Sequence, residues 1–363
     1  MKKRLILLHW LNLALTGATL AIALGSLVPS ELLPGISILA LLLPLLMAPH
    51  AIALLFWLRF KPRKAINNVI GLAILAFPLM AQWPYARAQA IAEEEIKVAT
   101  YNVRAFYQTT AAAKDIGKWS QDQSIDILCM QEIRRSAAGP LAMYYPFRAY
   151  APARKNYSVA IYSKYPIINS SPLLYSSLTQ QGYSRTSAQY ADIALPFDTV
   201  RIINVHLSST GVQDQDMEVV HSRDELLEAG QFVLSKLAST DKNRGLQAKH
   251  IIDWVNESPH PVILSGDFNG VPGGNLYWRL LRHLDDPYIF NGYGTMGSFE
   301  PFARRGLFFK IDWTLHSPEL HSRGQFIDNI SLSDHRPLIT RFSPDAPSLL
   351  EESEHSAHLF EPH

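Results

Sequence analysis

The chain has 363 residues and a formal net charge of +1, with 48% hydrophobic and 18% charged residues. This length exceeds the roughly 150 residues of an average domain. From residue 90 onward, 25 Lys and Arg stand against 31 Asp and Glu, a net charge of −6, so this part has no bulk basic footprint of the kind that nonspecific nucleic-acid binding requires.

The hydrophobic residues concentrate in three runs at the beginning of the chain: Leu5–Val28, Leu32–Leu58 and Ala65–Trp83. A membrane span needs roughly 20 apolar residues, and the first two runs meet that length. The third contains Asn67 and Asn68 and is marginal unless these amides face the other helices. Buried core helices are the alternative, but the first 60 residues hold only four Lys and Arg. We therefore predict a membrane anchor of three transmembrane helices at residues 1–83.

The basic residues predict the orientation of these helices. Lys2–Arg4 precede the first run and Lys61–Lys64 separate the second from the third, whereas Pro29–Glu31 contain no base. The positive-inside rule places the N-terminus and the Lys61–Lys64 loop in the cytoplasm. With three spans, the rest of the chain lies outside the cytoplasm; with two, it lies inside.

After a short linker at residues 84–95, strands and helices alternate up to residue 342. We expect strands at Ile96–Asn102, Ile125–Ile133, Ser158–Ile167, Ala191–Pro196, Thr199–Ser209, Pro261–Asn269, Phe308–Ser317 and Ser333–Phe342, and helices near Ala111–Ser120, Met217–Leu237, Gly245–Asn256 and Gly274–His283. Several strands follow one another without a helix between them, which favours a mixed α/β domain with more than one sheet. The polar, acidic tail at residues 343–363 is expected to be disordered.

The expected strands end in side chains that bind metals or phosphate. In chain order these are Asn102, Glu132, His206, Asp267 with Asn269, Asp312, and Asp334 with His335. Ligand sites in α/β proteins collect where strands end. Each residue alone is better explained as a turn residue, a cap or a satisfied histidine, but six such events in succession predict a site.

The segment "LSGDFNG" at Leu264–Gly270 carries two of these residues between glycines. On an extended chain, residues two apart point to the same side. Asp267 and Asn269 are therefore expected to face one phosphate together, and the glycines are expected to let the backbone turn sharply.

The motifs "ATYNVR", "DILCMQEI", "INVHLSS", "ILSGDFNGVP", "KIDWTLHS" and "SDHRPL" resemble, in this order, those of the endonuclease/exonuclease/phosphatase superfamily, which has the deoxyribonuclease-I-like fold. The resemblance covers about Ile96–Phe342. It implies an α/β four-layer sandwich of two mixed β-sheets flanked by helices, with the active site at one edge. The three-span front followed by this domain also resembles membrane-anchored members common in bacteria. Together with the distribution of basic residues, which places the catalytic domain outside the cytoplasm, this predicts a multi-pass protein of the bacterial inner membrane.

Phosphoester hydrolysis needs charge neutralisation, an activated water and a stabilised leaving oxygen. Oxygen ligands favour Mg²⁺, Mn²⁺ or Ca²⁺ over zinc. Glu132 is the first candidate ligand, with Asn102 beside it. By resemblance, Asp334 binds the metal or orients the neighbouring histidine.

The remaining candidates are assigned to catalysis. The resemblance implies that Asp312 orients an active-site histidine and that His206 stabilises the transition state or protonates the leaving group. His335 is expected to be the general base or a phosphate-contacting acid, Asp267 to position or deprotonate the water, and Asn269 to bond a non-bridging oxygen.

Three functions remain open at this stage. The chain is an extracytoplasmic phosphoesterase for lipid head groups or small phosphoesters, a membrane-anchored nuclease for DNA or RNA, or an inactive tethered binding module. Arg104, Arg185 and the basic–aromatic segment Phe302–Phe309 are candidate contacts to substrate phosphate or to the membrane surface, although solvated arginines and a hairpin explain them as well. The expected partners are the lipid bilayer and a phosphoester substrate; no obligate protein partner is evident.

Overall fold

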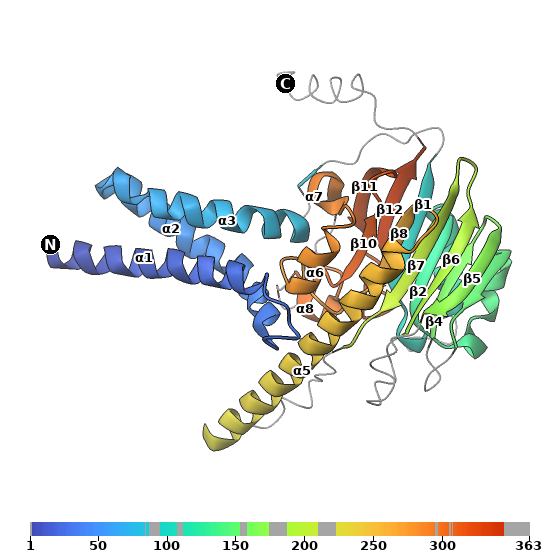
Figure 1. Cartoon of the computed structure of the whole chain (residues 1–363), viewed down its shortest axis with the longest axis horizontal. Coiled ribbons are helices and arrows are strands. Elements are labelled where there is room, and N and C mark those ends of the chain that lie inside the picture. The colour runs from blue at the N-terminus through green and yellow to red at the C-terminus, as the bar shows by residue number, and fades with distance from the viewer. Residues whose placement is uncertain are drawn as a thin grey trace.

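Two β-sheets pack face to face and carry helices on their outer faces, and three long helices precede them (Figure 1). This is the four-layer sandwich expected from the sequence. The computed structural model describes residues 2–83, 85–86, 95–106, 112–152, 158–173, 187–209, 223–294, 297–304, 306 and 308–344. Most of the expected linker, nearly all of the expected disordered tail, and Arg185 lie outside the described residues.

The first sheet has seven strands in the order β3-β4-β2-β1-β12-β11-β9. It is mixed, because β1 is parallel to β2 and β11 is parallel to β9, whereas the other pairs are antiparallel. Its strands are β1 (Ile96–Asn102), β2 (Ile127–Ile133), β3 (Phe147–Tyr150), β4 (Ser158–Ser163), β9 (Gly292–Gly294), β11 (His321–Ile327) and β12 (Leu338–Ser343).

The second sheet has five strands in the order β10-β8-β7-β6-β5 and is also mixed, because β7 and β8 are parallel. Its strands are β5 (Ile167–Leu173), β6 (Ser187–Ala194), β7 (Thr199–His206), β8 (Val262–Asp267) and β10 (Asp312–His316). The expected strand Ser158–Ile167 is in fact β4 and the beginning of β5, which belong to different sheets. The turn between them includes Pro166, which cannot donate to a strand ladder.

Successive side chains of a strand alternate between the core that separates the two sheets and the outer face of the sheet. In β1, Val98 packs into the core between the sheets, whereas Ala99 and Tyr101 pack on the opposite face. In β8, Ile263 faces the core between the sheets and Leu264 faces away from it. Side chains two residues apart share a face, so this alternation also determines which polar residues end up between the sheets.

Helices cover the two outer faces. Helix α4 (Ala112–Asp122) packs on the first sheet and α5 (Arg223–Asn256) on the second. The shorter helices are α6 (Asn275–Leu280), α7 (Tyr288–Asn291), α8 (Glu300–Ala303), and the 3₁₀ helices η3 (Arg104–Phe106), η4 (Arg135–Ala137) and η5 (Gly139–Met143). Part of the segment Phe302–Phe309 therefore belongs to α8.

Helix α5 is continuous, whereas the sequence predicted two helices separated at residues 238–244. This interval contains the polar run "STDKNR". In the structure Thr240, Asp241, Asn243 and Arg244 are all buried. The hydrogen bonds of Asp241 to Gly35 and of Arg244 to Ser208 join this part of the helix to distant parts of the chain.

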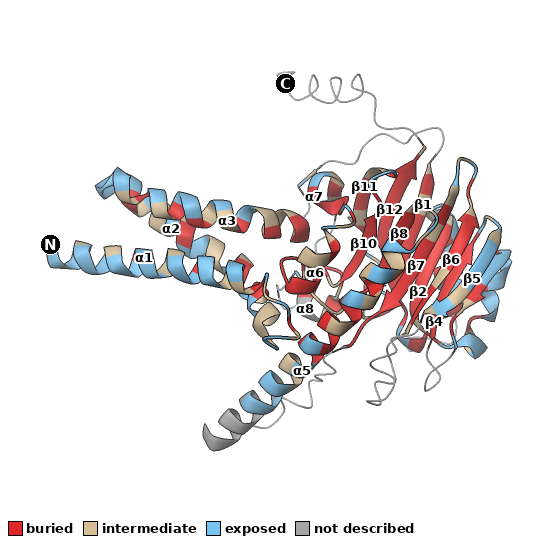
Figure 2. Cartoon of the chain, viewed as in Figure 1, coloured by how far each residue is buried: buried red, intermediate tan, exposed pale blue. Residues whose placement is uncertain are grey.

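Three helices at the N-terminus are long and apolar enough to cross a membrane. They are α1 (Lys2–Gly25), α2 (Leu43–Phe60) with the preceding 3₁₀ helix η1 (Ile36–Leu42), and α3 (Ile66–Gln82), which follows the 3₁₀ turn η2 (Pro62–Lys64). Figure 2 shows that much of the surface of these helices is exposed, whereas most strands of the sandwich are buried, with the edge strand β5 as an exception. Large exposed apolar surfaces of this kind fit contact with lipid.

In the marginal third run, the side-chain oxygen of Asn68 contacts a histidine of the neighbouring helix α2. His50 Nδ1 lies 3.2 Å from Asn68 Oδ1, and His50 Nε2 lies 2.9 Å from Thr19 Oγ1. Asn68 is fully buried. Asn68 thus faces α2, and through His50 is linked to Thr19 of α1, as was expected of both amides of this run; Asn67 is half-buried.

The helices pack directly on the sandwich through the connection between α1 and η1. The Trp278 indole N–H donates to Ser26 Oγ at 3.2 Å, and its ring stacks on Phe77 of α3. Asn275 donates to the Leu27 carbonyl at 3.0 Å. The connection between α1 and η1, together with α3, therefore forms an interface with the sandwich.

Replacing Gly266 with Ala is expected to destabilise the sandwich. Gly266 has a φ of +151°, and an added Cβ would collide with the Val205 carbonyl of the neighbouring strand. Strain of this kind costs on the order of 1–3 kcal/mol before the collision is added, so the free energy of unfolding should fall by at least about 2 kcal/mol. Urea unfolding of the full chain in detergent micelles measures it.

Gly139→Ala is the matched control, because an added Cβ at Gly139 meets no atom within 4 Å. Equal stabilities of the two variants would contradict the close approach of β7 and β8.

Candidate active site

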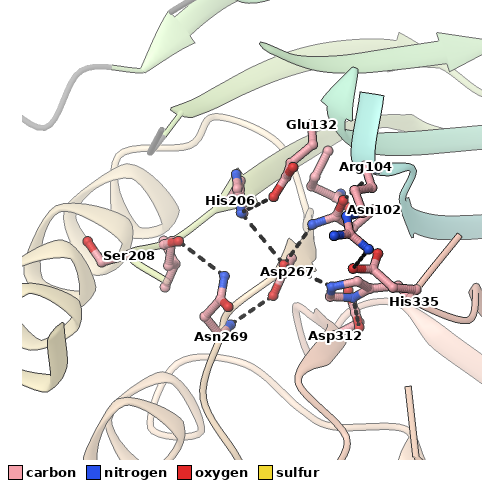
Figure 3. Close-up of polar contacts among 12 residues, drawn as sticks. Asn102, Arg104, Glu132, His206, Ser208, Asp267, Asn269, Asp312 and His335 are labelled. Carbon is pink, nitrogen blue, oxygen red and sulfur yellow. Dashed lines mark hydrogen bonds and ion pairs between the residues drawn. The ribbon is translucent and has the colours of Figure 1, made fainter. Parts of the chain in front are cut away.

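Strand register gathers the polar strand ends at one edge of the sandwich. In the first sheet, Asn102 is opposite Gln131, the residue before Glu132. In the second, Asp267 is opposite both His206 and Asp312. The ends of β1, β2, β7 and β8 and the beginning of β10 therefore meet, as Figure 3 shows for their side chains.

Asp267 is the centre of this group. Its Oδ2 accepts a hydrogen bond from Asn102 Nδ2 at 2.9 Å, which joins the two sheets. Its Oδ1 accepts the Asn269 backbone N–H at 2.9 Å. The carboxylate is 1% exposed, so these donors are what satisfy it in place of water.

His335 forms the strongest pair of the site with Asp312. Its Nδ1 lies 2.9 Å from Asp312 Oδ2, and its Nε2 lies 3.8 Å from Asp267 Oδ2. Burial lowers the pKa of His335, but the neighbouring carboxylates of Asp312, Asp267 and Asp334 raise it more, to about 10. Burial raises the pKa of Asp312. The pair therefore favours a protonated imidazole.

Ser298 fixes the strand that carries Asp312. Its hydroxyl accepts the backbone N–H groups of Ile311 and Asp312 at 2.9 and 3.1 Å. Nothing in the local sequence distinguishes this serine, because it acts through contacts that only the folded chain makes.

His206 lies between two carboxylates. Its Nε2 is 3.7 Å from Glu132 Oε1 and 3.7 Å from Asp267 Oδ2. These separations exceed a hydrogen bond, and Nε2 is buried with no hydrogen-bond partner among the described residues. His206 Nε2 is thus available to bind a ligand atom placed between this imidazole and the carboxylates of Glu132 and Asp267.

A β-bulge directs Glu132 into the site. Leu128 and Met130, which precede it by four and two residues, pack on the outer face of the first sheet, so strict alternation would place Glu132 there too. The register of β2 on β4 shifts between Met130 and Ile133, and Glu132 has a φ of +52°. Bulges beside active sites re-aim side chains in this way.

Arg104 and Asp334 form an ion pair at the more exposed side of the site, with Arg104 Nη1 3.2 Å from Asp334 Oδ2. The backbone N–H of Arg104 also donates a hydrogen bond to Asn102 Oδ1, at 3.1 Å. Its side chain is 57% exposed, so it is accessible to an anion that enters from solvent.

Asn269 reaches the site by a different geometry from the expected one. Strand β8 ends at Asp267, and Asn269 has a φ of +50°, so it is left-handed rather than extended. Its side-chain amide donates to the Leu207 carbonyl at 3.2 Å. The sharp turn is thus made by Asn269, while Gly266 serves the close approach to Val205.

The site contains a group of side chains suited to a cation. One ligand-type atom each from Asp267, Asp312 and His335 lie within 4.8 Å of one another. Asp312 Oδ1 is buried with no hydrogen-bond partner among the described residues. The predicted ligands Glu132 and Asn102 add a carboxylate and an amide from neighbouring strand ends (Figure 3). Oxygen-rich donor sets of this kind fit a hard divalent cation.

Polar residues behind the site were not recognised in the sequence. Gln131 Nε2 donates to Asn204 Oδ1 at 2.7 Å across the two sheets, and Arg244 of α5 donates to the Ser208 carbonyl at 3.2 Å. Arg185 lies outside the described residues. Buried polar side chains of this kind give no periodic signal, because their positions depend on partners distant in the sequence.

The sequence matches the model of the Endonuclease/Exonuclease/phosphatase family over residues 99–335, well over half of the chain. The match begins at the first residue of the motif "ATYNVR" and ends at the histidine of "SDH". No curated protein matches the chain.

Solved structures share the fold at low sequence identity. An endonuclease/exonuclease/phosphatase from Beutenbergia cavernae is 15% identical with a TM-score of 0.52, and covers 69% of this chain and 72% of its own. An endonuclease/exonuclease/phosphatase family protein from Bacteroides thetaiotaomicron is 15% identical with a TM-score of 0.50, covering 69% and 95%. A humanized D. rerio TDP2 is 12% identical with a TM-score of 0.51, covering 69% and 99%.

The His335–Asp312 pair predicts how stability depends on pH in the absence of added metal. Because the pKa of His335 rises from 6.5 to about 10 on folding, the folded chain binds more protons than the unfolded chain within this window. The contribution of His335 is therefore fully present below pH 6.5 and is lost as the pH approaches 10. Urea unfolding in the presence of EDTA should show stability falling across this window.

His335→Gln should flatten this pH dependence, whereas His321→Gln, a half-buried histidine outside the site, should retain it. An identical slope in wild type and His335→Gln would contradict the assignment.

Proposed function

Since the chain belongs to the endonuclease/exonuclease/phosphatase family, we propose that it is a divalent-metal-dependent phosphoesterase that acts from a membrane-anchored extracytoplasmic domain. The observation that carries this proposal is the convergence on Asp267. An amide, two imidazoles and two further acids from separate strands and loops surround this one buried carboxylate. Such a group costs stability unless a ligand uses it.

Glu132, Asn102 and Asp334 would hold the cation, Mg²⁺ in preference to Mn²⁺ or Ca²⁺. When bound, the cation supplies Lewis-acid polarisation of the phosphoryl and leaving oxygens. The backbone of Glu132 already points its carboxylate at the site. Asp334 is paired with Arg104, so we expect Arg104 to move toward substrate phosphate when the carboxylate binds metal.

The remaining residues bind and activate the reactants. Asp267 positions the attacking water or takes its proton, and Asn269 bonds a non-bridging oxygen. Of the two roles open to His335, its raised pKa supports the phosphate-contacting acid, with Asp312 holding the ring through Nδ1. His206 stabilises the transition state or protonates the leaving oxygen through its available Nε2.

We propose residues 1–83 as a three-span anchor, 84–95 as a linker, 96–342 as the catalytic domain and 343–363 as a disordered tail. Contacts support the side of the membrane. The connection between α1 and η1, which has no basic residue, packs on the sandwich. The basic turn η2 instead receives a hydrogen bond from Asn12 of α1. This separation agrees with a cytoplasmic basic loop and an extracytoplasmic sandwich.

Phospholipid head groups or small phosphoesters are the proposed substrates. The net charge of −6 from residue 90 onward disfavours nonspecific tracking along a phosphate backbone, which makes a nuclease the second candidate. An inactive module is the third. The buried His206 Nε2 and Asp312 Oδ1 beside Asp267, which have no hydrogen-bond partner among the described residues, disfavour it, because a ligand would give these atoms their partners.

Substitutions in the site should abolish turnover without unfolding the chain. We expect Asp267→Asn and His335→Gln each to lower kcat for bis-p-nitrophenyl phosphate roughly a hundredfold or more, because each removes an acid–base or charge-stabilising group. His321→Gln, outside the site, should retain activity. Purified full chain with Mg²⁺, assayed also on plasmid, RNA, sphingomyelin and inositol phosphates, measures both rate and substrate class; activity retained in both site variants would refute the assignment.

The proposed topology predicts which introduced cysteines react with a reagent that cannot cross the membrane. The natural Cys129 is fully buried and leaves a low background. In bacterial spheroplasts, a membrane-impermeant maleimide should label Lys164→Cys, on the sandwich, but label Arg63→Cys, in η2, only after permeabilisation. Labelling in the opposite order would place the catalytic domain in the cytoplasm.

A further inference from the structure

Helix α5 carries a buried polar group that the catalytic assignments leave unused. Five of its side chains are polar and at most 7% exposed. They are Thr240, Asp241, Asn243, Arg244 and Gln247. Buried polar groups are costly unless each has a partner, so the partners of this group indicate what it does.

At one end, the group holds the chain segment that follows His206. Arg244 Nη1 donates to the Ser208 carbonyl at 3.2 Å, and Gln247 Oε1 accepts the Ser208 N–H at 3.1 Å. Strand β7 ends at His206, so the sheet does not support Ser208; α5 binds both of its backbone groups.

This segment belongs to the active site. The residue between His206 and Ser208 is Leu207, whose carbonyl accepts the side-chain amide of Asn269 at 3.2 Å. Its N–H donates to the Asp267 carbonyl at 2.9 Å. A displacement of Ser208 would therefore shift His206, Asn269 and the backbone of Asp267 together.

At the other end, the group binds the connection between the first two membrane helices. Asp241 Oδ2 accepts the backbone N–H of Gly35 at 3.0 Å. Arg279 donates both to Glu31 Oε1 at 2.8 Å and to the Gly245 carbonyl at 2.9 Å. An added Cβ at Gly245 would meet the Glu31 carboxylate at 2.7 Å, so the absence of a side chain there lets Glu31 lie against α5.

The two ends meet at Asp241 and Arg244. Arg244 Nη2 lies 3.9 Å from Asp241 Oδ1, and both side chains are less than a tenth exposed. Burial lowers the pKa of Arg244, and Asp241 and Asp267 raise it. Removing either partner would leave a buried charge uncompensated, so the pair links the two ends of the group.

We propose that Asp241 and Arg244 are positioning residues that couple the connection between α1 and η1 to the His206–Asn269 side of the active site. The expected effect of this coupling on the reaction rate rests on the proposed function, whereas the structural coupling itself does not. Small misplacements of catalytic groups cost large factors in rate. The membrane anchor thus contributes to the alignment of the site as well as to its location.

The first test is kinetic and uses the full chain in detergent micelles with bis-p-nitrophenyl phosphate and Mg²⁺. We expect Arg244→Gln to lower kcat roughly 10- to 100-fold with a smaller change in KM. Arg244→Lys, which keeps the charge and a donor, should recover part of the rate. Lys242→Gln, an exposed residue on the same helix, should match wild type. Unchanged kcat in Arg244→Gln would overturn the proposal.

The second test does not depend on activity. Hydrogen–deuterium exchange of the peptide that covers residues 206–209 should rise in Arg244→Gln and also in Glu31→Gln, whose substitution lies on the membrane side, but not in Lys242→Gln. Because Glu31 is partly exposed, we expect Glu31→Gln to fold. This variant therefore tests the coupling even if Arg244→Gln fails to fold. Unchanged exchange in Glu31→Gln would overturn the proposal. Raised exchange in a chain that cleaves no phosphoester would support the coupling and refute the proposed function alone.

Discussion

The hydrogen bond between Asn102 and Asp267 joins the two sheets at the edge where the functional side chains meet. It links β1 of one sheet to β8 of the other at 2.9 Å. The same carboxylate organises the turn that follows it through the Asn269 N–H. Because Asp267 is 1% exposed, the loss of these two donors would leave a buried carboxylate poorly hydrogen-bonded, and that cost helps to hold the surrounding strands in place.

The layer between the sheets changes from apolar to polar along the strands toward the site. Away from the site it is apolar, with Val98, Ile127 and Ile263 in one core cluster. Toward the site, Gln131 and Asn204 bond each other across the sheets, and Asn204 also donates to the Met130 and Ala160 carbonyls. Hydrogen bonds between the two sheets restrict the arrangements open to this layer, so they help to hold the edge that carries the candidate site in place.

The N-terminal helices and the sandwich are connected by more than a tether. Trp278 stacks on Phe77 of α3, Glu31 pairs with Arg279, and Gly35 bonds to Asp241. These contacts mix apolar burial with hydrogen bonds, as in interfaces that hold two parts in a fixed orientation. Contacts of this kind fix how the sandwich is oriented relative to the three helices.

The sequence by itself determined the features that depend on local composition and periodicity. These are the three apolar helices, most of the strands, and the order of polar residues at the strand ends, since hydrophobic length and alternation are properties of neighbouring residues. Tertiary structure decided the rest. The bulge at Glu132 reverses the side that alternation assigns to it, Asn269 turns left-handed to reach Leu207, and α5 is continuous through "STDKNR", where Asp241 and Arg244 have distant partners. Each of these outcomes depends on contacts between residues far apart in the chain, which local pattern does not encode.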